Sequence, residues 1–133
     1  MENLLLDDNL NLILVDFGLS TEVGANNIKQ WCGTPAYVCP QILEQKAYNG
    51  MEADVFSLGV ILWCIVTGRK PFDLARRDDY FYNLLRNRCY DEYFRLTEQE
   101  NLSQEFKDLF VWMVAPEGFS RPTLRDIKVH NWF

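Results

Sequence analysis

The chain has 133 residues, 48% of them hydrophobic, which suits one domain or one lobe of a larger domain and argues against a disordered tail. Thirteen basic and nineteen acidic residues leave a formal net charge of −6, which argues against a surface that follows nucleic-acid phosphates. The sequence has no repeat and no secretory signal pattern, and its four cysteines form no C-x-x-C pair, so we expect reduced thiols in a cytoplasmic or nuclear protein.

The first predicted element is a β-hairpin. Leu4 to Leu6 and Leu10 to Val15 are short apolar runs, and Asp7-Asp8-Asn9 between them tolerate the backbone of a tight turn. From Phe17 to about Cys39 the apolar periodicity vanishes, while glycine, asparagine and proline accumulate. This pattern predicts a long loop, and loops of that length are usually functional or disordered.

A long apolar helix is predicted next. Glu52 and Asp54 open it and Gly68 closes it, and because it is apolar nearly all round we expect it at the centre of the fold. Its longest apolar stretch, Val55 to Val66, falls short of the roughly 20 residues that span a bilayer. The sequence therefore predicts a buried helix and no membrane segment.

Three further helices complete the prediction. Two are amphipathic, the second with Ser103 as its candidate N-cap, and Ser120 or Arg121 followed by Pro122 indicates the entry to a last short helix. The predicted fold class is therefore mainly α with one short N-terminal β-hairpin. The apolar positions that indicate the two amphipathic helices are Phe81, Leu84 and Leu85 in the first, and Phe106, Leu109, Phe110 and Met113 in the second.

Two residues near the start of the chain are candidate metal ligands. Asn3 stands thirteen residues before Asp16, and each lies at the edge of a predicted strand. A carboxamide and a carboxylate supply the hard oxygen ligands that Mg²⁺ prefers. Asp16-Phe17-Gly18 is followed fifteen residues on by Gly33-Thr34-Pro35, so two triplets bracket the predicted long loop.

Six motifs occur in one order along the chain. They are Glu2-Asn3-Leu4-Leu5-Leu6-Asp7, Asp16-Phe17-Gly18, Gly33-Thr34-Pro35-Ala36-Tyr37, Asp54-Val55-Phe56-Ser57-Leu58-Gly59-Val60, Pro71-Phe72 and Arg121-Pro122-Thr123. Together they resemble the C-terminal lobe of a eukaryotic serine/threonine protein kinase, closest to the calcium/calmodulin-dependent and AMP-activated branch. The resemblance covers residues 1–133 as a partial kinase domain, whose complete form is α+β.

The resemblance implies an ATP- and Mg²⁺-dependent enzyme that transfers the γ-phosphoryl group to a serine or threonine hydroxyl of a protein substrate. Asn3 and Asp16 match the residues that hold the Mg²⁺ ions bridging the ATP phosphates. Phe17 matches the residue whose packing sets the loop's active or inactive arrangement, and Gly18 lets the backbone turn. Thr34 matches the threonine near the catalytic base, where it has a supporting role.

Other positions carry a structural expectation beside the functional one. Asp54 matches the aspartate that accepts backbone hydrogen bonds from the catalytic loop, and helix capping is its alternative role. Trp31 and Tyr37 could shape the pocket for the residue after the phosphoacceptor, although aromatic core packing is at least as good an explanation. His130 is expected to be structural rather than a catalytic base.

The sequence departs from the family pattern at the substrate loop. Cys39-Pro40-Gln41 stands where the family usually has Ala-Pro-Glu, a glutamate that normally pairs with the arginine matching Arg121. Removing one partner of a buried ion pair typically costs about 3 to 5 kcal/mol. The Gln41 carbonyl can still accept a hydrogen bond, so we expect a weakened anchor, with Glu44 as a substitute partner for the arginine.

The sequence also departs from the family pattern at the site of activating phosphorylation and in the catalytic residues expected before Asn3. Gln30 stands where the related branch carries its activating phosphothreonine, so phosphorylation there is excluded, and Ser20 and Thr21 remain candidate phosphorylation sites. The aspartate of H-R-D-x-x-x-x-N would lie five residues before Asn3, ahead of Met1, and the lobe carrying the ATP-clamping lysine is also absent. We therefore expect a fragment that is inactive alone, with a pseudokinase-like protein-binding scaffold as the alternative function.

Overall fold

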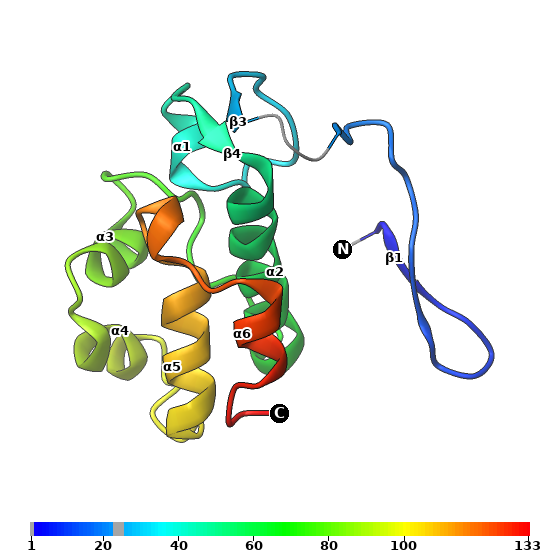
Figure 1. Cartoon of the computed structure of the whole chain (residues 1–133). Helices are drawn as coiled ribbons and strands as arrows, with labels where there is room; N and C mark the ends of the chain where they lie inside the picture. The colour runs from blue at the N-terminus through cyan, green and yellow to red at the C-terminus, as the bar shows by residue number, and fades with distance from the viewer. Residues whose placement is uncertain (1, 23–25) are drawn as a thin grey trace.

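The computed structural model describes residues 2–22 and 26–133, and it places a β-hairpin to one side of a helical body (Figure 1). The mainly helical class with a short hairpin is confirmed, and a second two-stranded sheet, β3 with β4, was not predicted. In chain order the elements are β1 (Leu4–Leu6), β2 (Leu12–Leu14), β3 (Asn26–Ile28), α1 (Pro40–Leu43), β4 (Tyr48–Asn49), α2 (Gly50–Thr67), α3 (Tyr80–Arg86), α4 (Tyr90–Leu96), α5 (Gln104–Met113), the 3₁₀ turn η1 (Gly118–Ser120) and α6 (Leu124–Lys128).

The hairpin turn is longer than predicted. Leu10 has a φ of 64°, and the Asp7 carboxylate accepts bonds from the backbone N–H groups of Asn9 at 2.9 Å and Asn11 at 2.7 Å. These bonds place residues 7–11 in the turn, because an aspartate can close a turn by bonding its own backbone a few residues on. Strand β2 therefore begins at Leu12, and antiparallel pairing joins Leu4 to Leu14 and Leu6 to Leu12.

Helix α2 organises the helical body. Its N-cap is Asn49, whose side chain accepts from the backbone N–H groups of Met51 and Glu52, and Gly68 ends it with a φ of 73°. Glycine takes this left-handed conformation without a Cβ penalty. The predicted opening was three residues late because an asparagine cap, rather than the first acidic side chain, starts the helix.

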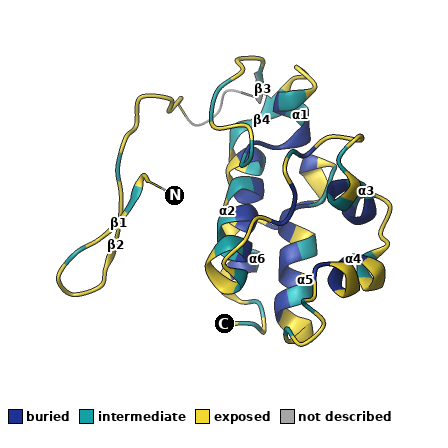
Figure 2. Cartoon of the chain, turned by 180° about the vertical axis from the view of Figure 1, so that it is seen from behind, coloured by how far each residue is buried: buried dark blue, intermediate teal, exposed yellow. Residues whose placement is uncertain are grey.

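The core lies between α2 and the helices that follow it, where Figure 2 shows buried residues facing inward. The fully buried Trp63 ring contacts the rings of Tyr93, Phe94, Phe106 and Phe110, and the Trp63–Phe110 centroids are 4.4 Å apart. Aromatic rings in such tilted arrangements add about 0.5 to 1.5 kcal/mol per pair beyond their burial. This cluster fixes α2, α4 and α5 against one another.

The far face of α2 differs from the prediction. Leu58, Ile65 and Val66 are exposed, so only one side of this apolar helix is buried among the described residues. By length and composition alone α2 meets the requirements for a membrane span, with a mean hydropathy of 1.6. Its contacts with α5 give it the role of a core helix, which passes the same test.

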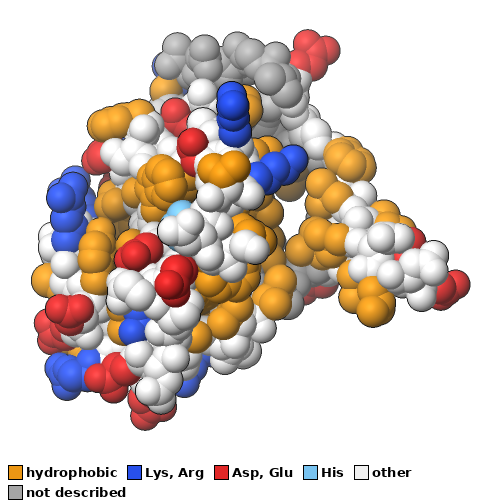
Figure 3. All heavy atoms as spheres, turned by 60° about the horizontal axis from the view of Figure 1, so that its bottom comes forward, with side chains coloured by type: hydrophobic (Ala, Val, Ile, Leu, Met, Phe, Trp, Pro, Cys, Tyr) orange, Lys and Arg blue, Asp and Glu red, His pale blue; other side chains and the backbone are white. Residues whose placement is uncertain are grey.

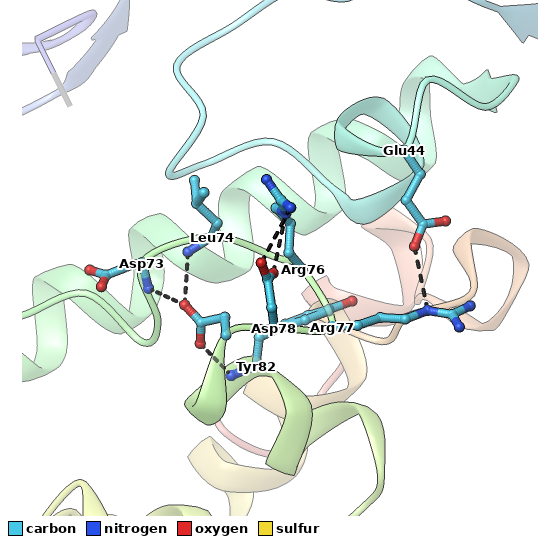
Figure 4. A network of polar contacts seen from close by, with 8 residues as sticks. Glu44, Asp73, Leu74, Arg76, Arg77, Asp78 and Tyr82 are labelled. Atoms are coloured by element: carbon cyan, nitrogen blue, oxygen red, sulfur yellow. Dashed lines mark hydrogen bonds and ion pairs between the residues drawn. The ribbon is translucent and has the colours of Figure 1, made fainter.

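Side-chain caps start the later helices. Asp79 caps α3 through Tyr82 N–H at 2.9 Å and also accepts from the Asp73 and Leu74 N–H groups, which closes the preceding loop (Figure 4). Ser103 caps α5 as predicted, accepting from Phe106 N–H at 3.2 Å.

Three further helices differ from the prediction. Helix α6 is capped by Thr123 through a capping box with Asp126 and begins at Leu124, so Pro122 lies outside the helix and the predicted entry was two residues early. Helices α1 and α4 were not predicted, and neither begins with a side-chain cap that would have marked its start.

Candidate functional site

Asn3 and Asp16 lie at the same end of the hairpin. The Asn3 carbonyl accepts a hydrogen bond from Val15 N–H at 3.0 Å, which continues the ladder of β1 and β2 and brings the residue before β1 beside the residues after β2. Asp16 has a φ of 63°, and its Oδ1 accepts from Gly18 N–H at 3.0 Å. That these two side chains form one site stays a prediction.

The donor set of this hairpin end suits a hard divalent cation. Both side chains are exposed, and the bond from Gly18 leaves the second oxygen of the Asp16 carboxylate unbonded. Mg²⁺ is usually bound through one or two protein oxygens together with substrate phosphates and water. Within residues 2–22 and 26–133, no three His, Cys, Asp or Glu side chains gather into a metal-binding group, so phosphate or water oxygens would have to complete the coordination.

The residues after Asp16 form an exposed turn. A bond from Ser20 N–H to the Phe17 carbonyl at 3.0 Å closes it, and the Phe17 ring is 66% exposed. A Cβ on Gly18 would lie 3.1 Å from Asp16 Oδ1, which explains the absence of a side chain at that position. Ser20 and Thr21 are exposed, so kinases could reach either hydroxyl.

The hairpin is not bonded to the helical body within the described part of the chain. Among residues 3–22, every hydrogen bond runs to another residue of the same stretch. Figures 1 and 2 show this stretch beside the body, exposed along most of its length. The structure therefore brings Asn3 and Asp16 together but does not bond them to the loop that holds Thr34. Met1 and the predicted loop residue Gly24 lie outside the described residues.

The loop around Thr34 is tied to helix α2. The Thr34 carbonyl accepts from Tyr37 N–H at 3.0 Å, and Ser57 Oγ donates to the Tyr37 carbonyl at 2.9 Å. Gly33 has a φ of 99°, and a Cβ there would lie 2.8 Å from Val38 Cγ1, so this turn requires glycine. The Gly33-Thr34-Pro35 triplet is thus a structured turn, with the Thr34 side chain exposed.

Gln41 and Arg121 form the anchor that the sequence predicted. Arg121 Nη2 donates to Gln41 Oε1 at 2.9 Å, so the expectation that the glutamine carbonyl accepts from this arginine is confirmed. Gln41 Nε2 donates to the Pro116 carbonyl at 2.7 Å, and the Arg121 guanidinium lies 4.9 Å above the Phe56 ring. Arg121 is 7% exposed, and burial lowers its pKa. A buried cation here is held by neutral acceptors.

The substitute partner proposed for Arg121 was wrong. Glu44 pairs with Lys46 through a close contact. It also pairs at 3.9 Å with Arg77, in the loop that precedes α3 (Figure 4). Main-chain carbonyls provide the missing acceptors instead. Arg121 Nε donates to the Ala115 carbonyl at 2.8 Å, and Nη1 donates to the Glu52 carbonyl at 2.9 Å.

Asp54 lies on α2 without a capping role, because Asn49 is the N-cap and Glu52 is the acidic residue of the first turn. The Asp54 side chain is exposed and makes no hydrogen bond or ion pair to another described residue. Neighbouring atoms nevertheless remove enough water to raise the pKa of its carboxyl group. The prediction that it caps the helix is wrong, and its role toward a catalytic loop stays a prediction.

Two of three further predicted residues have packing roles. His130 Nδ1 accepts from Trp132 N–H at 3.3 Å and its ring lies near Trp112, which fits the structural role expected of it. Tyr37 packs against the core, and burial raises the pKa of its hydroxyl. Trp31 is half exposed, so core packing does not account for it.

Tyr48 was missed by the sequence analysis. Its hydroxyl donates to the Gln30 carbonyl at 3.0 Å and lies 3.7 Å from Cys32 Sγ, so this residue of β4 contacts the predicted long loop. No sequence periodicity could have revealed it, because β4 is two residues long. The Asn49-Gly50 pair beside it was the available signal for a turn or helix start.

Two cavities lie on the helical body. One of about 310 Å³ lies between α4 and α5, and Asp91, Glu100, Lys107 and Asp108 are among its lining residues. The other, of about 270 Å³, adjoins the Gln41 and Arg121 anchor. Neither of these two cavities includes Asn3 or Asp16 in its lining, and both residues are exposed.

Comparison with known proteins identifies the arrangement. The family described as "Protein kinase domain" matches residues 1–133. The chain is 39% identical to "Probable serine/threonine-protein kinase MARK-B" of Dictyostelium discoideum, over 99% of the chain and 18% of that protein. It is 37% identical to "SNF1-like protein kinase ssp2" of Schizosaccharomyces pombe, over 99% of the chain and 22% of that protein. It is 35% identical to "Serine/threonine-protein kinase SIK2" of Gallus gallus, over 98% of the chain and 16% of that protein.

The chain thus spans about a fifth of the length of these relatives. All three relatives are named protein kinases, two of them serine/threonine kinases, which confirms the part of the resemblance that concerns a serine/threonine protein kinase. Protein kinases as a family use ATP and Mg²⁺.

Proposed function

Because the chain belongs to the protein kinase domain family, we propose that it forms the C-terminal-lobe part of a serine/threonine kinase that transfers the γ-phosphoryl group of ATP to protein hydroxyls. One observation carries the proposal. The bond between Val15 N–H and the Asn3 carbonyl supports it, because it brings Asn3, which matches one of the family's Mg²⁺ ligands, beside the residue that precedes Asp16, which matches the other. The same hairpin end would therefore present a carboxamide and a carboxylate to one cation.

In this proposal Asn3 and Asp16 would hold Mg²⁺, which when bound offsets the phosphate charge that builds up during transfer. The bond from Gly18 N–H orients the Asp16 carboxylate and keeps one oxygen available. Thr34 supports the substrate side from a loop that Ser57 ties to α2. The Asp54 carboxylate has no bonding partner among the described residues and its pKa is raised by desolvation, which leaves it available to accept backbone hydrogen bonds from a catalytic loop.

The remaining catalytic parts would come from outside residues 1–133. Phosphoryl transfer in kinases needs an aspartate base and an ATP-contacting lysine, and no H-R-D-x-x-x-x-N sequence or glycine-rich loop occurs in this stretch. The relatives are about five times longer than the matched region, which leaves room for those parts. We propose that this stretch alone transfers no phosphate. The four free cysteines support a cytoplasmic or nuclear location.

A pseudokinase-like scaffold is the second candidate function. Gln41 supports it, because a neutral residue takes the place of the family's glutamate and its bond to Arg121 lacks the charge of a carboxylate. The apolar residues exposed on the hairpin and on α2 would be the binding surface in that case.

Phosphorylation of a serine-containing peptide by the complete polypeptide that carries these residues, with ATP and Mg²⁺, separates the two functions. A kinase incorporates phosphate into the peptide at a rate that rises with Mg²⁺. A scaffold folds and leaves the peptide unmodified. Transfer by residues 1–133 alone would contradict the proposed division of catalytic parts.

A further inference from the structure

The segment of residues 26–32 lies against the N-terminal end of helix α2. Strand β3 pairs antiparallel with β4, with Asn26 opposite Asn49 and Ile28 opposite Tyr48. Figure 1 shows this small sheet directly at the start of α2. Because Asn49 is also the N-cap of α2, the backbone that receives β3 is continuous with the buried core helix.

The Tyr48 side chain bonds this segment two residues after the end of β3. Its hydroxyl donates to the Gln30 carbonyl at 3.0 Å, and Cys32 Sγ lies 3.7 Å from the same oxygen. The Tyr48 ring is half-buried and packs against the main core cluster, so this packing fixes the position of the hydroxyl. Burial raises the pKa of Tyr48 to about 12, so the phenol keeps its proton at neutral pH.

Close packing of Ile28 also holds residues 26–32 against the start of α2. A Cβ on Gly50 would lie 3.2 Å from Ile28 Cδ1, so the Ile28 side chain rests on the first residue of α2. Downstream, Ser57 Oγ donates to the Tyr37 carbonyl at 2.9 Å. The chain between Ile28 and Tyr37 is thus tied to α2 on both sides of Thr34.

We propose that Tyr48 is a positioning residue whose hydroxyl fastens residues 26–32 to helix α2, so that the turn holding Thr34 keeps its place without covalent modification of the segment. The functional consequence of this role rests on the proposed kinase function. In a kinase, the substrate loop would be held in position without phosphorylation by an upstream kinase. The bonds involve only backbone groups and the Tyr48 hydroxyl.

Hydrogen exchange of the unmodified chain tests the proposal. The chain is produced in bacteria, its mass is checked for the absence of phosphate, and amide exchange is followed by mass spectrometry in wild type, Tyr48→Phe and Tyr80→Phe. Tyr80 is the matched control, because its ring is 60% exposed on α3 and none of the hydrogen bonds described here involves its hydroxyl. Alkylation of Cys32, measured against the exposed Cys89, provides a second local readout.

We expect peptides covering residues 26–33 to be protected in wild type and in Tyr80→Phe. In Tyr48→Phe they should exchange roughly two- to tenfold faster, as the loss of one hydrogen bond allows, and Cys32 should alkylate faster by a similar factor while Cys89 does not change. Peptides from α5 should exchange equally in all three proteins.

Three results would overturn the proposal: an unprotected segment in wild type, unchanged exchange in Tyr48→Phe, or an increase that extends equally to α5. The last would mean that the hydroxyl supports the whole body rather than the segment. None of these readouts uses catalysis, so their failure leaves the kinase proposal intact, and an inactive complete protein leaves the fastening role intact.

Discussion

At the residue scale, Arg121 shows how a buried cation can be kept without a carboxylate. Its guanidinium is satisfied by one amide oxygen and three main-chain carbonyls, those of Glu52, Ala115 and Pro116. Hydrogen bonds to charged groups contribute about 1.5 to 3 kcal/mol, against about 0.5 to 1.5 kcal/mol for neutral pairs. The Gln41 amide also bonds Pro116, so it serves both sides of the anchor.

Gln41→Glu should stabilise the chain by about 1 kcal/mol at pH 7, because a charge-assisted bond to Arg121 replaces a neutral one and outweighs the lost bond to Pro116. The arginine lowers the pKa of the new carboxyl group in the folded state. The gain is therefore present above the unfolded pKa of about 4.3 and is lost as the pH falls through the lowered folded pKa. Gln41→Leu, which removes both bonds, should cost about 1 to 3 kcal/mol. Urea unfolding at pH 7 and pH 4 measures all three proteins, and a glutamate variant weaker than wild type at pH 7 would contradict this account.

Asp54 provides a second pH-dependent test. Its carboxyl pKa is raised by desolvation, so the folded state binds the proton more tightly than the unfolded state does. Its contribution to stability therefore declines as the pH rises from the unfolded pKa of about 3.9 through the raised folded value. Asp54→Asn should raise the melting temperature at pH 7 and flatten its pH dependence in that window. A lower melting temperature at pH 7 would mean that the carboxylate has a stabilising partner.

At the element scale, the contact between α2 and α5 depends on a glycine. A Cβ on Gly59 would lie 2.9 Å from both Met113 Cβ and Val114 Cγ1, and the Met113 atom cannot move without its helix. Glycine inside a helix costs roughly 0.5 to 1 kcal/mol relative to alanine, so the close approach of the two helices is what justifies it.

Gly59→Ala should therefore destabilise the chain by about 1 to 2 kcal/mol, because overpacking exceeds the gain in helix propensity. Leu58→Ala on the exposed side of the same helix is the control and should change stability by less than about 0.5 kcal/mol. Thermal unfolding monitored by circular dichroism compares them. A Gly59→Ala protein more stable than wild type would show that the helices can separate freely.

The elements also show what the sequence could and could not predict. Long periodic segments such as α5, with its Ser103 cap, were recognisable because apolar spacing and capping chemistry are local properties. Strand β3 and the Tyr48 contact were not, because they pair residues about twenty positions apart through backbone groups that every sequence has. The prediction that Glu44 pairs with Arg121 was wrong for the same reason. Which cation lies near Glu44 depends on how the loop before α3 folds.

At the scale of the whole molecule, the hairpin and the helical body differ in how they are stabilised. The body surrounds an aromatic core, whereas the hairpin exposes most of its apolar side chains, including Leu12 at 65% and Leu14 at 58% (Figure 3). An isolated two-stranded hairpin is marginally stable in water. Contiguous exposed apolar surface of this kind favours association.

Replacing Leu12 and Leu14 with lysine should therefore lower self-association without changing the melting temperature of the helical body. Analytical ultracentrifugation over a range of protein concentrations measures the association, and near-ultraviolet circular dichroism follows the aromatic core during melting. A double variant that associates as strongly as wild type would show that self-association does not use these hairpin leucines. A large fall in melting temperature would show that the hairpin packs on the body in solution.

The metal role of the hairpin end is tested most directly by peptide phosphorylation in the complete polypeptide with Asp16→Asn. Asparagine can still accept the bond from Gly18 N–H, so the turn is retained while the negative charge is lost. Asp8→Asn, in the exposed turn of the same hairpin, is the matched control. We predict that Asp16→Asn lowers turnover by roughly a hundredfold or more while Asp8→Asn leaves it unchanged. Equal turnover by Asp16→Asn and wild type, at the same Mg²⁺ concentration, would contradict the assignment.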